Sequence, residues 1–168
     1  MIKYHWSSNA TENCCDGIRF IIEKELTGLN ISKAGLSVAG IILIKFGNIA
    51  IVESRNRDSA YETRDVGEWE LLVEQADWSI TKDSAVICSA DSSSDEINAA
   101  ISDICNDEIS SISIERSGSI TISTSDGNIS LEVKPTECRL ERLSQWIIFR
   151  RNKWSLEFTY DCEFVLSD

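Results

Sequence analysis

Acidic side chains are the residues of this chain that could most readily do chemistry. Aspartate and glutamate number 28 among 168 residues. Two carboxylates at a suitable separation can support glycoside hydrolysis. With so many acids, however, some pair satisfies such a spacing by chance. The sequence therefore assigns no catalytic residue, and we expect a protein that is not an enzyme.

The residue types that usually bind metals or act as nucleophiles form no recognisable motif. His5 is the only histidine, and the six cysteines include no C-x-x-C pair. Asp91–Asp95 offers oxygen ligands but lacks the glycine and distal glutamate of a helix-loop-helix calcium site, so it predicts a loop and helix cap. We expect no metal and no cofactor. Cys88, Cys105 and Cys162 lie in apolar patterns and are predicted to be buried free thiols of a reduced, cytoplasmic protein.

Negative charge is the property that most restricts the possible partners. The formal net charge is −12, and two acidic segments account for it. Residues 58–77 hold seven acids and one base, and residues 91–108 hold six acids and no base, whereas residues 134–153 hold six bases and two acids. Such a field repels nucleic acids and anionic membranes and attracts cationic proteins. We therefore expect a basic protein partner, no nucleic acid and no membrane.

The elements that must position these residues follow a doubled pattern of one helix and an antiparallel meander. The pattern predicts an α+β fold with packed sheets and two helices related by an approximate two-fold. It also predicts a single domain over residues 1–168, with internal repeats at about 16–90 and 94–168. The matching segments are 26–31 with 104–109, 40–44 with 118–122, 47–51 with 127–131, and 69–80 with 146–156.

Hydrophobic periodicity and turn residues predict the individual elements. In the first unit we expect a helix over 17–26, strands over 36–45 and 49–53, a charged loop over 54–67, a hairpin of 69–73 and 78–81, and a strand over 85–90. In the second unit we expect a helix over 96–105, capped by Ser94 or Asp95, and strands over 109–115, 119–124, 128–134, 145–150, 153–159 and 163–166.

Two groups of side chains are predicted to build the core. The alternating set is expected to face one core: Ile112, Ile114, Ile120, Ile122, Ile129, Leu131 and Val133. The tryptophans that recur with the repeat are expected to pack in the interior: Trp69, Trp78, Trp146 and Trp154. The alternative role of the tryptophans is a stacking platform for single-stranded nucleic acid, which needs a basic groove beside it.

The order of turns and apolar alternation resembles a known protein class. Trp69, Trp78-Ser-Ile80, a short helix, Ile109-x-x-Ile-x-Ile114, Gly118-x-Ile-x-Ile122, Gly127-x-x-Ser-Leu131 and Trp146 together resemble small bacterial immunity proteins. These are antidotes to polymorphic toxins, including those of contact-dependent growth inhibition, and the resemblance covers about residues 66–150. It implies a protein that binds one cognate toxin domain, commonly a nuclease, and blocks it. The doubled layout also resembles the Whirly fold, which implies a single-stranded nucleic-acid-binding module as the alternative.

Charge, rather than the resemblance, selects the candidate partner-binding residues. Acids at 58–70 and 91–108 are expected to mimic phosphate or to occlude the active site of a basic toxin. An exposed sheet edge could also accept a strand from the toxin. The candidate residues are Asp58, Glu62, Asp65, Glu68, Glu70, Asp91, Asp95, Glu96 and Asp103.

Overall fold

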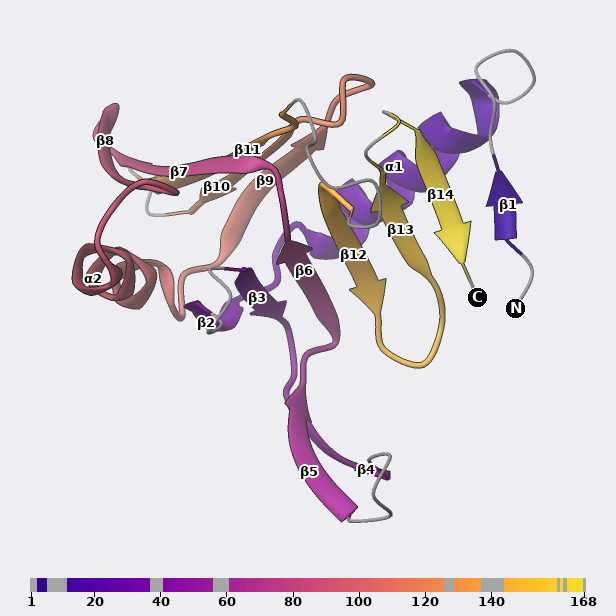
Figure 1. Ribbon diagram of the computed structural model, residues 1–168, viewed down its shortest axis with the longest axis horizontal. Coiled ribbons are helices and arrows are strands. Elements are labelled where there is room, and N and C mark those ends of the chain that lie inside the picture. Colours follow the sequence, from indigo (N-terminus) through magenta and orange to yellow (C-terminus); the bar gives the residue numbers. More distant parts are fainter. Residues whose placement is uncertain are drawn as a thin grey trace.

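The residues that the structure describes form two helices and three antiparallel sheets, which confirms an α+β architecture with mainly antiparallel strands (Figure 1). The computed structural model describes residues 3–5, 12–36, 41–55, 61–125, 129–136, 144–159, 161 and 163–167. Helix α1 spans Glu12–Leu26 and helix α2 spans Ser94–Ile104.

The strands form sheets of seven, five and two members. The seven-stranded sheet has the order β1 (Lys3–His5), β14 (Phe164–Ser167), β13 (Ser155–Phe158), β12 (Trp146–Arg150), β6 (Trp69–Val73), β3 (Ile42–Phe46) and β2 (Ile31–Leu36). The five-stranded sheet has the order β8 (Ala85–Ser89), β7 (Asp77–Lys82), β11 (Ile129–Lys134), β10 (Ile120–Thr124) and β9 (Ile109–Ile114). Strands β4 (Ala50–Arg55) and β5 (Tyr61–Val66) pair with each other.

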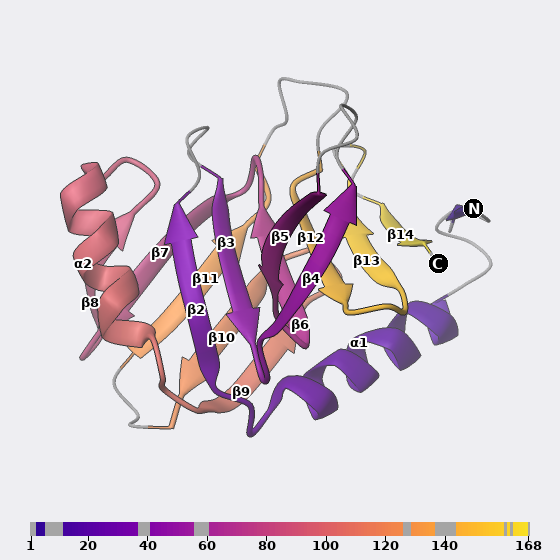
Figure 2. The same cartoon turned by 90° about the horizontal axis from the view of Figure 1, so that it is seen from below.

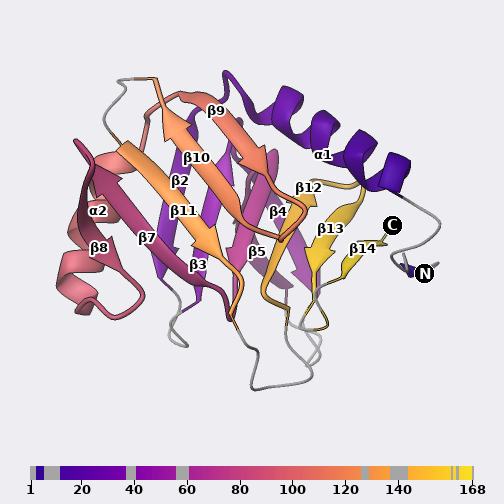
Figure 3. The same cartoon turned by 90° about the horizontal axis from the view of Figure 1, so that it is seen from above.

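The two larger sheets lie one behind the other, with α1 along one border and α2 at the opposite edge (Figures 2 and 3). Their facing surfaces supply the core, because side chains alternate between the two faces of a strand. All seven alternating residues predicted for the core are buried. Trp69, Trp78 and Trp146 are also buried, and Trp154 packs partly buried against them, which confirms the predicted interior role.

Helix α1 closes the free edge of β9. It buries Ile22 and Leu26, and its polar side chains reach the main chain of Ile114. Arg19 Nη1 donates to the Ile114 carbonyl at 3.1 Å, and the Ile114 N–H donates to Glu23 Oε1 at 3.0 Å. The helix therefore satisfies strand-edge groups that would otherwise need water or another strand.

Helix α2 covers the edges of β2 and β8 and buries Ile97, Ala100, Ile101 and Ile104. Its N-cap is Ser93, so the predicted cap at Ser94 or Asp95 is wrong by one or two residues. Ser93 and Glu96 form a capping box, in which each side chain accepts a hydrogen bond from the other residue's main-chain N–H.

An aromatic cluster joins the two sheets around Trp146. Its ring stacks on Phe158 with a centroid separation of 5.8 Å, and Phe164 completes the cluster. The Trp146 Nε1–H donates to the Gly118 carbonyl at 2.6 Å, from the turn between β9 and β10. Gly118 has φ +81°, and a Cβ there would overlap the Phe158 ring, so this turn requires glycine.

Three predictions about the first unit are wrong. The predicted strand 36–45 is two strands, β2 and β3, with residues 37–40 outside the described part of the chain. The predicted loop 54–67 contains β5, whose partner is β4. The predicted hairpin of 69–73 and 78–81 does not form, because β6 joins the seven-stranded sheet and β7 the five-stranded sheet.

Gln145 explains why the chain changes sheets between β6 and β7. Its carbonyl accepts the N–H groups of Glu74, Gln75 and Ala76 at 3.0, 3.2 and 3.3 Å. Its fully buried amide side chain bonds both main-chain groups of Thr136. In a tight hairpin, these three N–H groups would need partners within the turn or its two strands. Here the Gln145 carbonyl accepts them, so the chain can pass from one sheet to the other.

Candidate functional site

Strands β4 and β5 form an arm that projects away from the two packed sheets (Figure 1). The arm continues the β3–β6 ladder along the same two chain segments. Pairing in the ladder ends at Phe46↔Trp69, and pairing in the arm begins at Ala50↔Val66. A side chain beyond that point has no second sheet to bury it, and Ile51 is 75% exposed.

Two glycines lie where the ladder turns into the arm. Gly47 has φ +70°, a conformation that residues with a Cβ rarely adopt. At Gly67 a Cβ would lie 2.5 Å from the Trp69 carbonyl oxygen and 3.0 Å from Lys45 Cβ. The close approach at Gly67 and the left-handed turn at Gly47 together fix the direction in which the arm leaves the sheet.

Charged side chains hold the foot of the arm to the outer face of the seven-stranded sheet. Lys45, only 8% exposed, donates to the Asp65 carbonyl and lies 3.6 Å from Glu70 Oε1, which also accepts the Gly67 N–H at 3.0 Å. Lys33 Nζ lies 2.8 Å from Asp65 Oδ2. The hydrogen bond from Lys33 lowers the pKa of Asp65, and the same bond raises the pKa of Lys33.

Arg151 ties both strands of the arm to the turn after β12. Its main-chain N–H donates to the Glu68 carbonyl at 3.0 Å. Its guanidinium Nη1 donates to the carbonyl groups of Asn48 and Val66, each at 3.3 Å. One side chain thus bridges the segment that enters the arm and the segment that leaves it.

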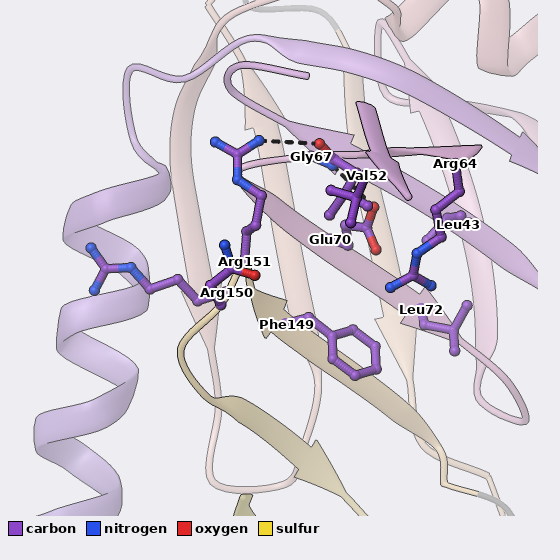
Figure 4. A pocket seen from close by; sticks show the side chains of 11 residues that line it. Leu43, Val52, Arg64, Gly67, Glu70, Leu72, Phe149, Arg150 and Arg151 are labelled. Atoms are coloured by element: carbon purple, nitrogen blue, oxygen red, sulfur yellow. Dashed lines mark hydrogen bonds between the residues drawn. The ribbon is translucent and has the colours of Figure 1, made fainter. Parts of the chain in front are cut away.

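A groove of about 360 Å³ lies between the arm and the outer face of the sheet (Figure 4). Leu43, Leu72 and Phe149 contribute apolar surface from β3, β6 and β12, and Val52 and Arg64 face them from the arm. Strand alternation explains this arrangement, because Leu43 and Leu72 are register partners on the face opposite the core. The Arg64 guanidinium points toward Leu72 and Phe149 in Figure 4 and has no ion-pair partner among the described residues.

Arg150 lines the same groove but is directed away from it, toward α1 (Figure 4). It forms an ion pair with Glu25 of that helix. Its guanidinium carbon also lies 5.2 Å from the centre of the Trp69 ring, within cation–π distance. Arg150 therefore joins α1 to the sheet, while Arg64 and Arg151 remain as the cations on the arm side.

An acidic surface surrounds α2 at the far edge of the molecule. Asp91, Asp95, Glu96 and Asp103 are all exposed. The main-chain hydrogen bond from Ser93 lowers the pKa of Glu96, and Lys82 lies 3.2 Å from Asp103. A hollow of about 210 Å³ beside this surface is lined partly by Asp77, Asp91 and Glu132.

The predicted partner-binding acids thus fall into two groups. Asp65, Glu68 and Glu70 lie at the foot of the arm, where Asp65 and Glu70 already contact lysines. Asp91, Asp95, Glu96 and Asp103 lie around α2, and strands β2 and β3 separate the groups. Glu62 lies in β5, but its side chain is outside the described part, as is the whole of Asp58.

The bases of residues 134–153 do not share one role. Lys134 pairs with Glu132 at 2.7 Å, Arg150 pairs with Glu25, and Arg151 bonds carbonyl groups at the arm. Arg139 and Arg142 lie outside the described part of the chain.

The predicted histidine and cysteines have separate places in the fold. His5 lies in β1, opposite Val165 of β14. Cys88 is a buried free thiol as predicted, Cys105 is half-buried, and Cys162 is outside the described residues.

Sequence reasoning missed the groove. The signal was present at Leu43, Leu72 and Phe149, which are apolar at positions that alternate with core residues and so face outward.

The described residues contain no group of three or more side chains placed to hold a metal ion. Within the same residues, no helix is long and apolar enough to cross a bilayer. Comparisons with protein-family models, curated proteins and solved structures found no match to this chain.

Proposed function

We propose that this protein is a binding inhibitor of the immunity-protein class. It neutralises one cognate toxin domain, a basic protein of the nuclease type, by covering the surface that binds the toxin's substrate. The proposal joins two arguments: the resemblance over residues 66–150 and the distribution of exposed charge. The observation that carries it is the exposed acidic surface around α2, in a chain with a net charge of −12.

Electrostatics gives this surface its proposed role. Nucleases bind polyanions, so their substrate-binding surfaces are basic, and a field of opposite sign accelerates encounter with them. Residues 91–108 contain six acids and no base, and among the side chains that the structure describes, Lys82 is the one base that forms an ion pair with them, at Asp103. Most of the charge of this segment is therefore left to act on a partner.

The projecting arm supports a binding role in a second way. Ile51 of the arm is 75% exposed, and Ile49 at the base of the arm is 39% exposed, so apolar side chains remain accessible there. Exposed apolar side chains on a rigidly held element are typical of protein-binding surfaces. Contacts at the arm would add buried apolar area to the charge attraction offered by α2.

We also infer that the two units arose as repeats of one helix-plus-meander pattern. Helix α1 contacts β9 of the second unit, and α2 contacts β2 of the first. In the β6–β12 pairing Trp69 lies opposite Arg150, and Val73 lies opposite Trp146. The repeat aligns Trp69 with Trp146 and Val73 with Arg150, so the second pair is the first with the two units interchanged. Both relations are those expected for units related by an approximate two-fold, and the arm is a departure from it.

The test is binding to the basic toxin domain encoded beside this chain, followed by charge reversal. The purified pair should form a stable complex in a pull-down, and the toxin's nuclease activity should fall in proportion to added inhibitor. Asp95→Lys combined with Asp103→Lys should slow association about tenfold at low salt, since exposed charges act mainly on the on-rate.

A matched control keeps this test specific. Glu115→Lys combined with Asp161→Lys changes the net charge by the same amount at exposed positions away from α2. This control should retain most of the association rate in stopped-flow mixing. Absence of binding at micromolar concentration would end the proposal, and equal slowing by both double variants would remove α2 from it.

Single-stranded nucleic-acid binding is the alternative function. It requires the bases of residues 134–153 to act together, whereas Lys134 and Arg150 are paired with acids. A titration with a labelled oligonucleotide at two salt concentrations distinguishes the functions, because such binding would weaken steeply as salt increases.

A further inference from the structure

The groove at the foot of the arm carries a charge opposite to that of the whole molecule. Three arginines and one carboxylate, of Glu70, line it, and Arg150 pairs with Glu25, which leaves the guanidinium groups of Arg64 and Arg151. That carboxylate is already neutralised, because it accepts the Gly67 N–H at 3.0 Å and lies 3.6 Å from Lys45. In the described part of the chain, no carboxylate pairs with Arg64 or Arg151, so the groove has a positive surplus.

The same groove has an apolar floor. Leu43, Leu72 and Phe149 face outward from the central strands of the seven-stranded sheet, where a single-sided sheet normally presents polar residues. Val52 of the arm faces them across the groove. A surface that combines apolar side chains with an unpaired guanidinium is suited to a group that is itself apolar on one side and anionic on the other.

We propose that the groove binds a short extended segment of the partner protein in which an apolar side chain adjoins an aspartate or glutamate. The apolar side chain packs on Leu72 and Phe149, and the carboxylate bonds the Arg64 guanidinium through parallel N–H donors. Charge complementarity carries this assignment, because a basic segment would meet Arg64 and Arg151. The inference rests on the proposed function in taking the occupant to be a segment of a protein.

Recognition with two signs of charge gives the complex a defined orientation. The acidic surface around α2 attracts the basic substrate-binding face of the partner, while the groove accepts an acidic and apolar segment of it. A partner rotated into another pose would place like charges together at one of the two sites, which is unfavourable. The groove therefore supplies selectivity, and the α2 surface supplies the rate of encounter.

The experiment is a titration of the full ¹⁵N-labelled chain with the blocked peptide acetyl-Leu-Phe-Asp-amide, followed by NMR. Saturable shifts should appear at Leu43, Leu72 and Phe149, with a Kd on the order of 1 mM for so few contacts. The peptide acetyl-Leu-Phe-Asn-amide, which lacks only the charge, should bind about fivefold more weakly.

Two variants locate the effect. Arg64→Gln changes an exposed side chain, so the NMR spectrum should remain that of a folded protein. The variant should lose the preference for the Asp peptide. Arg116→Gln, on the turn after β9, removes an equal charge next to Asp16 and should leave the preference intact. The proposal is overturned if shifts at the groove do not saturate, if both peptides bind equally to the natural chain, or if Arg64→Gln keeps the preference.

The titration contains no toxin, so its failure and failure of the proposed function can be told apart. If the peptides cause no saturable shifts at the groove while the toxin pull-down succeeds, this inference alone is rejected. A groove that discriminates the peptides while the pull-down fails rejects the nuclease-type partner and supports a different protein that presents an acidic and apolar segment.

Discussion

The β3–β6 ladder and the arm that continues it are built by the same two chain segments, yet their environments are opposite. In the ladder Ile44, Phe46, Trp69 and Leu71 are at most 1% exposed, because a second sheet covers one face. In the arm Ile51, at 75% exposed, has no such cover. Only residues 47–49 separate buried β3 from β4 of the arm, and only residues 67–68 separate β5 of the arm from buried β6. Buried apolar side chains in the two packed sheets therefore supply the stability, whereas the arm beyond Gly47 and Gly67 supplies accessible surface.

The strongest test of this contrast removes a core aromatic side chain. Trp146→Ala should lower the free energy of unfolding by about 3–5 kcal/mol, because it leaves a cavity and strips the ring from Phe158 and Phe164. Ile51→Ala in the arm should change it by at most about 0.5 kcal/mol. Urea denaturation followed by circular dichroism measures both, and comparable losses would mean that the arm belongs to the folded core.

A smaller effect is expected where the two regions join. Gly67→Ala should cost about 1–3 kcal/mol, since the new methyl group meets the Trp69 carbonyl and Lys45. Gly35→Ala in β2 is the matched control, because nothing lies within 4 Å of its added Cβ. Thermal unfolding should separate the two variants clearly. If both are neutral, the bend is not fixed by the close approach at Gly67.

The smallest effect concerns the Lys33–Asp65 pair between β2 and the arm. Because the folded state lowers the pKa of Asp65, the pair's stabilisation is present above the unfolded pKa of about 4 and is lost as pH falls through the folded value. Because the pKa of Lys33 is raised, the same contribution is complete below about pH 10 and is lost as pH rises through the folded pKa.

NMR can follow this pair directly. The Asp65 carboxyl should titrate at lower pH in the natural chain than in Lys33→Gln, and the protection of the arm amides against hydrogen exchange should fall as Asp65 becomes protonated. Asp16 lies in α1, outside the arm, and its hydrogen bond with Arg19 lowers its pKa, so this carboxyl should titrate alike in both proteins. An Asp65 titration that is unmoved by Lys33→Gln would show that the arm is held without this contact.

The sequence predicted the second unit better than the first, for a physical reason. Strands β9, β10 and β11 each have one face in the core, so alternation marks them, and their seven predicted core residues are buried. Among the described side chains of β5, Thr63 and Arg64 are exposed and only Val66 is buried, so this segment lacks the apolar alternation of a core strand and its sequence predicts a loop. The β6–β7 corner depends on Gln145, which lies about 70 residues further along the chain.

The candidate site could be predicted in part. Composition located the acids around α2, since a segment without bases stays exposed and charged. It could not distinguish free acids from Asp65 and Glu70, because their lysine partners become neighbours only when the arm forms. Nor could it show the groove, since Leu43 and Phe149 meet only through the register of β3, β6 and β12.

The contact of α1 with the border of β9 has a consequence for behaviour in concentrated solution. Arg19 and Glu23 occupy both main-chain groups of Ile114, so a foreign strand would have to displace a helix before it could extend the sheet there. Templated, amyloid-like growth is thereby obstructed on this flank. The arm leaves Ile51 exposed, so a blocked edge at β9 removes a second surface at which copies of this chain could associate.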